Sequence, residues 1–200
     1  YMVKSGLIDN PDVSQYRLTA HFSAAVVIYG YMFWVALSLM KAPFGAVRKA
    51  SNGLVAATVV TTIWIFVTMM SGGFVAGLDA GLTYNTYPLM DGDIVPDGLW
   101  AMSPWYLNLF ENITTVQFNH RILAHLTVLW VFGIWWLVRK SELPMSTRKT
   151  FHALMVMVWL QIALGITTLL MAVPVSFASL HQAGSLVVFT FALWATHSLI

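Results

Sequence analysis

Residues 116–138 read VQFNHRILAHLTVLWVFGIWWLV, and this stretch decides the class of the protein. It is apolar over a length that crosses the hydrocarbon core of a bilayer, about 30 Å thick, as one α-helix. His120 and Arg121 lie near its beginning, about one helical turn inside the membrane. A neutral imidazole at that depth is costly unless it has a partner, so His120 indicates a functional site.

The composition of the whole chain agrees with a membrane protein. Hydrophobic residues make up 58% of the sequence and charged residues 9%, whereas soluble proteins are about one quarter charged. The net charge of +2 is too small to indicate nucleic-acid binding. The absence of cysteine excludes a disulfide, a thiolate haem ligand, an iron–sulfur cluster and a cysteine zinc site. Residues 1–4 lack the pattern of a signal peptide.

Five stretches are long and apolar enough to cross a membrane. Lipid cannot bond to exposed backbone groups, so each stretch is expected to be an α-helix. We predict an all-α integral membrane protein with spans at 18–40, 54–77, 116–138, 151–173 and 177–200. The last four spans are expected to form a four-helix bundle. Glycines at a spacing of four residues indicate close helix approach at Gly73, Gly77 and Gly81.

The distribution of charge predicts the orientation in the membrane. Basic residues gather in loops 41–53 and 139–150, as Lys41, Arg48, Lys49, Arg139, Lys140, Arg148 and Lys149. The long loop 78–115 has no Lys or Arg and carries five acidic residues. The positive-inside rule places the basic loops in the cytoplasm or mitochondrial matrix and the acidic loop outside. That outer loop, dense in turn-forming residues, is expected to be a lid or a docking surface.

Three histidines share one depth near the outer face, namely His21, His120 and His181. His120 and His181 begin the third and fifth spans, and alternate helices of a four-helix bundle face each other across its core. This geometry suits a b-type haem held by one imidazole on each side. Structural histidines that bond to backbone carbonyls, a proton path and another metal remain as alternatives. His125 lies about 140° around the helix from His120 and cannot share its ligand.

Polar residues next to the two histidines are candidates for contacts with a cofactor. Arg121 can pair with a haem propionate through its planar fork, or it can anchor the helix at headgroup level. Gln182 follows His181 directly. Gln117 lies one turn before His120 on the same face, where it orients a ligand or bonds to a neighbouring helix.

A faint internal repeat indicates how the chain is organised. Residues 13–14 are Val-Ser and lead to His21, and residues 175–176 are Val-Ser and lead to His181. The first span therefore resembles the fifth, as in membrane proteins built from repeated halves. We predict that residues 1–53 end one half, and that residues 54–200 form a complete four-helix half that binds haem.

Several motifs along the chain resemble the haem A synthase family, in its proteobacterial and mitochondrial branch. They are GLDAGLTYNTYPLM at 77–90, FEN at 110–112, VQFNHR at 116–121, LHQ at 180–182, YMVKSGL at 1–7 and YRLTAH at 16–21. The resemblance runs through the whole chain. Some Gram-positive members carry a cysteine pair in outer loops, and its absence here means that a thiol role does not transfer.

The resemblance implies eight helices in two pseudo-symmetric halves, of which this chain holds helices four to eight. It implies oxidation of the C8 methyl of haem O to a formyl group, which gives haem A for terminal oxidases. His120 and His181 match the ligands of a resident haem b, and His21 matches a histidine of the half that holds substrate haem. The partner histidine and a catalytic glutamate belong to a helix absent from this sequence. Gln117 stands at the equivalent place in this half.

The same resemblance implies a multi-pass protein of the bacterial or mitochondrial inner membrane. Its ligands would be haem O and membrane lipid, and its candidate protein partners are haem O synthase, cytochrome oxidase assembly factors and further copies of itself. No nucleic acid is expected. Two other classes of function remain open: a b-type cytochrome subunit that carries electrons without modifying haem, and a transporter-like bundle with histidines on a proton path.

Overall fold

The computed structural model describes residues 13–40 and 50–200. Within these ranges it contains five long α-helices, two short 3₁₀ helices and no β-strand. The long helices are α1 (Gln15–Met40), α2 (Asn52–Gly77), α3 (Ile113–Arg139), α4 (Met145–Leu170) and α5 (Val175–His197). All five are long and apolar enough to cross a membrane. The predicted all-α membrane fold is therefore confirmed.

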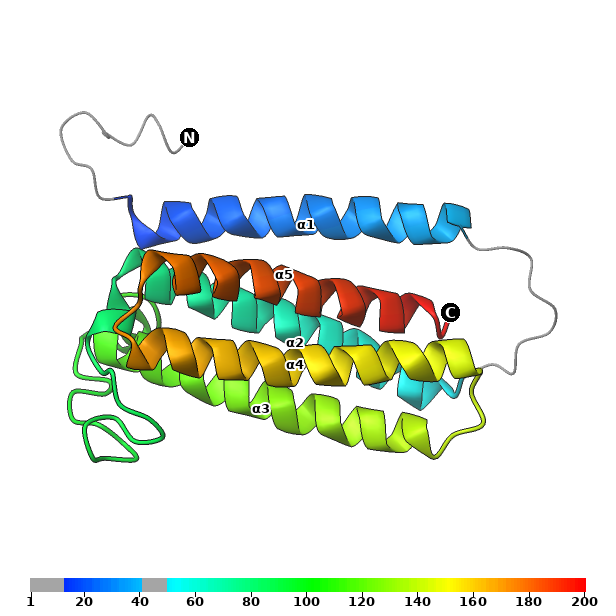
Figure 1. The fold of residues 1–200 in the computed structure, drawn as a ribbon. Helices are drawn as coiled ribbons and strands as arrows, with labels where there is room; N and C mark the ends of the chain where they lie inside the picture. Colours follow the sequence, from blue (N-terminus) through cyan, green and yellow to red (C-terminus); the bar gives the residue numbers. More distant parts are fainter. Residues whose placement is uncertain (1–12, 41–49) are drawn as a thin grey trace.

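Helices α2 to α5 form a closed four-helix bundle (Figure 1). Each of them packs against the next along the chain, and α5 returns to pack against α2. Helix α1 lies outside this ring, against α2 and α5. Helices α3 and α5 consequently lie diagonally across the bundle, where inward side chains from two helices can share one ligand.

The half of the bundle farther from the loop between α2 and α3, here called the inner half, is filled by apolar side chains and by hydroxyls that have hydrogen-bond partners. Val131, Phe151 and Leu154 are almost completely buried in it. The buried hydroxyls of Thr58 and Thr61 donate to carbonyls one turn earlier in their own helix, at 2.8 Å in both cases. Such internal bonds remove the cost of burying a polar group. The inner half is therefore packed, and space for a ligand lies in the outer half.

The largest difference between a predicted boundary and the structure lies at the beginning of the fourth span. The fourth span was predicted at 151–173, but α4 begins directly after Pro144 and ends at Leu170. Ala172 and Val173 both have a φ of 56°, in the left-handed region, and this ends the helix. Hydropathy detects only the part of a helix that lies in lipid, whereas Pro144 and Pro174 mark where α4 and α5 begin.

Small residues on α2 bring α1 close. A Cβ atom added at Gly73 would lie 2.9 Å from Oγ1 of Thr19, and one at Gly77 would lie 2.6 Å from the Cα of Gln15. Both positions leave no room for a side chain, so the predicted close approach is confirmed for this pair of glycines. Gly81 lies beyond α2 and packs instead against Val173.

The outer loop between α2 and α3 has its own internal scaffold. It contains the 3₁₀ helices η2 (Ala80–Leu82) and η3 (Trp105–Leu109). Asn108 is fully buried and donates to the carbonyls of Met102 and Trp105 at 2.8 and 2.9 Å. Asn112 begins α3 by accepting from the amide of Thr115 at 3.0 Å.

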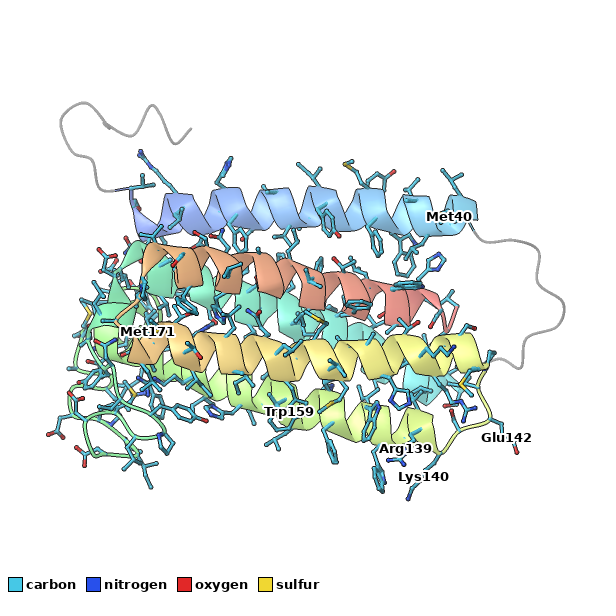
Figure 2. All side chains as sticks on the ribbon, in the orientation of Figure 1. Met40, Arg139, Lys140, Glu142, Trp159 and Met171 are labelled. Carbon is cyan, nitrogen blue, oxygen red and sulfur yellow. The ribbon has the colours of Figure 1, made fainter. Side chains whose placement is uncertain are left out.

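The loop and the basic residues lie at opposite ends of the bundle. Figure 2 labels Arg139, Lys140 and Glu142 at one end and Met171 at the other, on the side of the outer loop. The other predicted basic loop, with Lys41, Arg48 and Lys49, lies outside the described residues.

Candidate functional site

A cavity of about 590 Å³ lies in the outer half of the bundle. Residues from all five helices and from the outer loop line it, and most of its wall is apolar. Ligand pockets in proteins have volumes of roughly 300–1,000 Å³, so the cavity is large enough for a cofactor. The polar residues on its wall include His120, Gln117, Arg121 and His125 from α3, Gln161 from α4, and His181 and Gln182 from α5.

His120 is held by the neighbouring helix α2. Its Nδ1 lies 2.7 Å from Oγ of Ser71. A Cβ atom at Gly72 would lie 3.2 Å from Cε1 of the imidazole. The absence of a side chain at Gly72 therefore allows the ring to pack directly against α2. The contact with Ser71 sets the orientation of the ring.

His181 is held by α4 in a similar way. Its Nδ1 lies 3.1 Å from Nε2 of Gln161, and the same amide nitrogen donates to the carbonyl of His181 at 2.8 Å. A Cβ atom at Gly165 would lie 2.7 Å from Cε1 of the imidazole. Each histidine thus lies over a glycine of a neighbouring helix.

Arg121 and Gln117 fasten the outer loop over the cavity. Nη1 and Nη2 of Arg121 donate to the carbonyls of Thr86 and Tyr84, at 2.9 and 2.7 Å. Nε2 of Gln117 donates to the same Tyr84 carbonyl at 3.0 Å. Asn85 donates to the carbonyl of Leu169 at 2.9 Å, which ties the loop to α4 as well. Residues 84–87 are therefore a lid held from two helices.

A tyrosine–histidine pair completes this attachment. Nδ1 of His125 lies 2.6 Å from the carbonyl of Arg121, so its N–H donates there and leaves Nε2 as an acceptor. The Tyr87 hydroxyl lies 3.0 Å from Nε2 and donates to it, with the two rings stacked. His125 therefore belongs to the lid contact and not to the pair formed by His120 and His181, as the helical spacing predicted.

The remaining histidines lie away from the cavity. His21 is exposed on α1 and does not line it. His152 accepts from the indole of Trp135 at 2.7 Å, and His197 lies 3.1 Å from the hydroxyl of Ser38, both toward the basic end. The structure thus brings His120 and His181 into one cavity and separates His21 from them.

The residues of the cavity fit a flat cofactor that carries carboxylates. Two imidazoles enter from opposite helices, and each lies over a glycine that leaves space beside it. Nε of Arg121 is buried and has no hydrogen-bond partner among the described residues, so this donor can bind a carboxylate. Oε1 of Gln117 is likewise buried without such a partner and requires a donor.

The sequence also matches a known family over nearly its whole length. Residues 1–193 match the COX15–CtaA family, described as cytochrome oxidase assembly proteins. The chain belongs to this family. Among curated members, it is 49% identical over 200 residues to the heme A synthase of Nitrosospira multiformis, covering all of this chain and 56% of that protein.

Eukaryotic members of the COX15–CtaA family are similar as well. The chain is 42% identical over 213 residues to the human heme A synthase COX15, of which it covers 50%. It is 40% identical over 210 residues to the Arabidopsis thaliana protein of the same name, of which it covers 46%. The chain spans about half the length of the curated relatives that it matches.

Sequence reasoning missed the residues that hold the two histidines. Ser71, Gly72, Gln161 and Gly165 lie on helices different from those of the histidines they contact. The run Ser-Gly-Gly at 71–73 and the lone Gly165 were visible signals, because glycine inside a helix usually marks close packing. Which side chain packs there was visible only after the helices were assembled.

Proposed function

We propose that this chain carries the resident-haem half of a haem A synthase, which oxidises the C8 methyl of haem O to a formyl group. Membership of the COX15–CtaA family supports the activity, and the pair of histidines in one cavity supports a haem. That pair is the observation that carries the proposal. Residues 54–200 would form the haem-binding unit, with α1 belonging to the other half.

In this proposal His120 and His181 would hold a haem b between them. A haem with two histidine ligands keeps no open position on its iron and supplies electron transfer. Arg121 would bind a haem carboxylate through Nε, which has no partner among the described residues. Gln182, on the wall beside His181, would contact the same group.

His21 would serve the second haem, which is the substrate. Its exposure on the outer surface of α1, away from the cavity, supports a separate site. His21→Ala in the full-length protein should stop haem A formation while the resident haem stays bound. Loss of the resident haem in this variant would show that the assignment of His21 to the substrate site is wrong.

Absorption spectra of the purified chain with bound haem test the ligands. Replacing His120 or His181 with alanine should abolish the low-spin spectrum that two histidine ligands produce. Retention of that spectrum in both single variants would exclude the assignment. Extraction of haem pigments from cells supplied with haem O then separates a synthase from an electron-carrying b-type cytochrome, since only the synthase produces haem A.

The partners and the membrane follow from the same proposal. The substrate is haem O, the product serves cytochrome oxidase, and haem O synthase and oxidase assembly factors are the protein partners. The membrane would be the bacterial inner membrane or the mitochondrial inner membrane. The outer loop would face the periplasm or the intermembrane space. The acidic residues of this loop and the basic residues at the opposite end of the bundle support that orientation.

A further inference from the structure

The two histidines of the cavity are held by hydrogen bonds of opposite direction. The hydroxyl of Ser71 donates its single proton to the carbonyl of Thr68, at 2.7 Å. Its oxygen is therefore an acceptor toward His120, and the proton in the 2.7 Å contact comes from Nδ1 of the ring. A neutral imidazole protonated on Nδ1 has its lone pair on Nε2, which is the form that can bind a metal.

Gln161 holds His181 in the other form. Its amide nitrogen donates to the carbonyl of His181 at 2.8 Å, and this bond decides which end of the amide is the donor. The same nitrogen lies 3.1 Å from Nδ1 of His181, so Nδ1 is the acceptor there. In that form the proton of the neutral ring is on Nε2.

We propose that Ser71 positions His120 as the preorganised, stronger haem ligand, and that His181 binds iron only after its hydrogen bonds with Gln161 rearrange. This inference rests on the proposed function, since it takes both histidines as ligands of one haem. His120 meets the incoming haem with a free lone pair and binds first. His181 first has to move its proton from Nε2 to Nδ1, and this makes it the weaker ligand.

The first experiment compares single-histidine variants reconstituted with iron protoporphyrin IX. His181→Ala should keep haem as a high-spin complex with one histidine ligand. His120→Ala should retain roughly 10-fold less haem than His181→Ala, which is the size of effect that changes around a metal ligand commonly have. Equal loss of haem from both variants would overturn the inference, whereas a wild-type chain that binds no haem would instead overturn the proposed function.

The second experiment leaves both ligands in place and changes Ser71. Ser71→Ala should weaken haem retention about 10-fold and raise the reduction potential, because an acceptor at Nδ1 makes the ligand more basic. Ser71→Thr keeps the hydroxyl and should restore both values. Thr167→Ala is the matched control: it removes a hydroxyl bonded to its own helix, at 2.9 Å, outside the cavity.

If His120→Ala does not fold, Ser71→Ala can still test whether Ser71 positions His120. Its elution volume and helix content report folding independently of haem. A folded Ser71→Ala protein with the retention and potential of Thr167→Ala would show that Ser71 does not position His120. Gln161→Leu removes the amide donor, and it should keep the low-spin spectrum and retain haem at least as well as wild type. Loss of that spectrum in Gln161→Leu would contradict the role given to Gln161.

Discussion

Arg121 divides its guanidinium between the lid and the cavity. From the sequence we expected its fork to bind a haem carboxylate, but in the structure both outer nitrogens donate to loop carbonyls. Its Nε is buried and has no partner among the described residues. In the proposed function, one residue would thus tie closure of the lid to recognition of a carboxylate.

Replacing Arg121 should loosen both contacts. Arg121→Lys keeps the charge but cannot reach two carbonyls and a carboxylate together, and Arg121→Gln also loses the charge. Each charge-assisted bond contributes about 1.5–3 kcal/mol, so haem occupancy should fall in the order wild type, Lys, Gln. Chymotrypsin should cleave residues 84–100 faster in the same order. Unchanged occupancy and cleavage in both variants, matching Arg139→Gln as control, would leave Arg121 as a membrane anchor.

Gly165 sets how closely His181 packs on α4. An alanine Cβ there would lie 2.7 Å from Cε1 of the imidazole, whereas at Gly133 it would meet nothing within 4 Å. We expect Gly165→Ala to push the ring away, to destabilise the fold by about 1–3 kcal/mol and to change the low-spin haem spectrum. Gly133→Ala should change neither. A normal spectrum in Gly165→Ala would mean that the ring does not depend on this seat.

At the scale of elements, α1 is held to the bundle at both of its ends. Gly73 and Gly77 of α2 allow its backbone to come close. The Tyr16 hydroxyl donates to Glu111 at 2.8 Å at the outer end, and Ser38 contacts His197 at the inner end. The close approach of α1 and α2 places Leu18 and Phe22 on the wall of the cavity.

Adding a methyl group at Gly77 should push α1 away from α2. The Cβ of Gly77→Ala would lie 2.6 Å from the Cα of Gln15, and a backbone atom cannot turn away as a side chain can. Ser23 of α1 contacts Met70 of α2, so a cysteine pair at these positions reports the distance in a cysteine-free chain. Oxidative cross-linking should fall in Gly77→Ala and stay unchanged in Gly53→Ala, where a Cβ meets nothing. Equal yields would show that α1 does not need the glycine.

At the scale of the whole molecule, charge is separated along the bundle axis. The loop between α2 and α3 carries acidic residues and no basic ones, and Arg139 and Lys140 lie at the opposite end. In a membrane this asymmetry sets orientation, because basic segments stay on the inner side.

Cysteine labelling tests that orientation. Asp93 is exposed on the loop, and Ser146 is exposed at the beginning of α4, at the other end of the bundle. Asp93→Cys should react with a membrane-impermeant maleimide added outside, whereas Ser146→Cys should react only after the inner face is opened. The reverse pattern would invert the topology.

The prediction of the fold succeeded where lipid imposed a strong constraint. Five helices, the diagonal placement of His120 and His181, and the close approach at Gly73 all follow from hydropathy, depth and spacing. The boundary of α4 was placed wrongly because its first turns lie beyond the apolar run. The role of Arg121 in the lid was missed because backbone carbonyls of a loop leave no pattern in the side chains.

The sequence by itself determined that this protein is a bundle of membrane helices with two histidines at one depth, because lipid allows only helices and penalises polar groups without partners. Only the tertiary structure decided which groups those histidines meet. Ser71, Gly72, Gln161 and Gly165 come from neighbouring helices, and the rotation of each helix about its axis depends on packing with all the others. The difference between His120 and His181 therefore belongs to the assembled bundle and to no single segment of the chain.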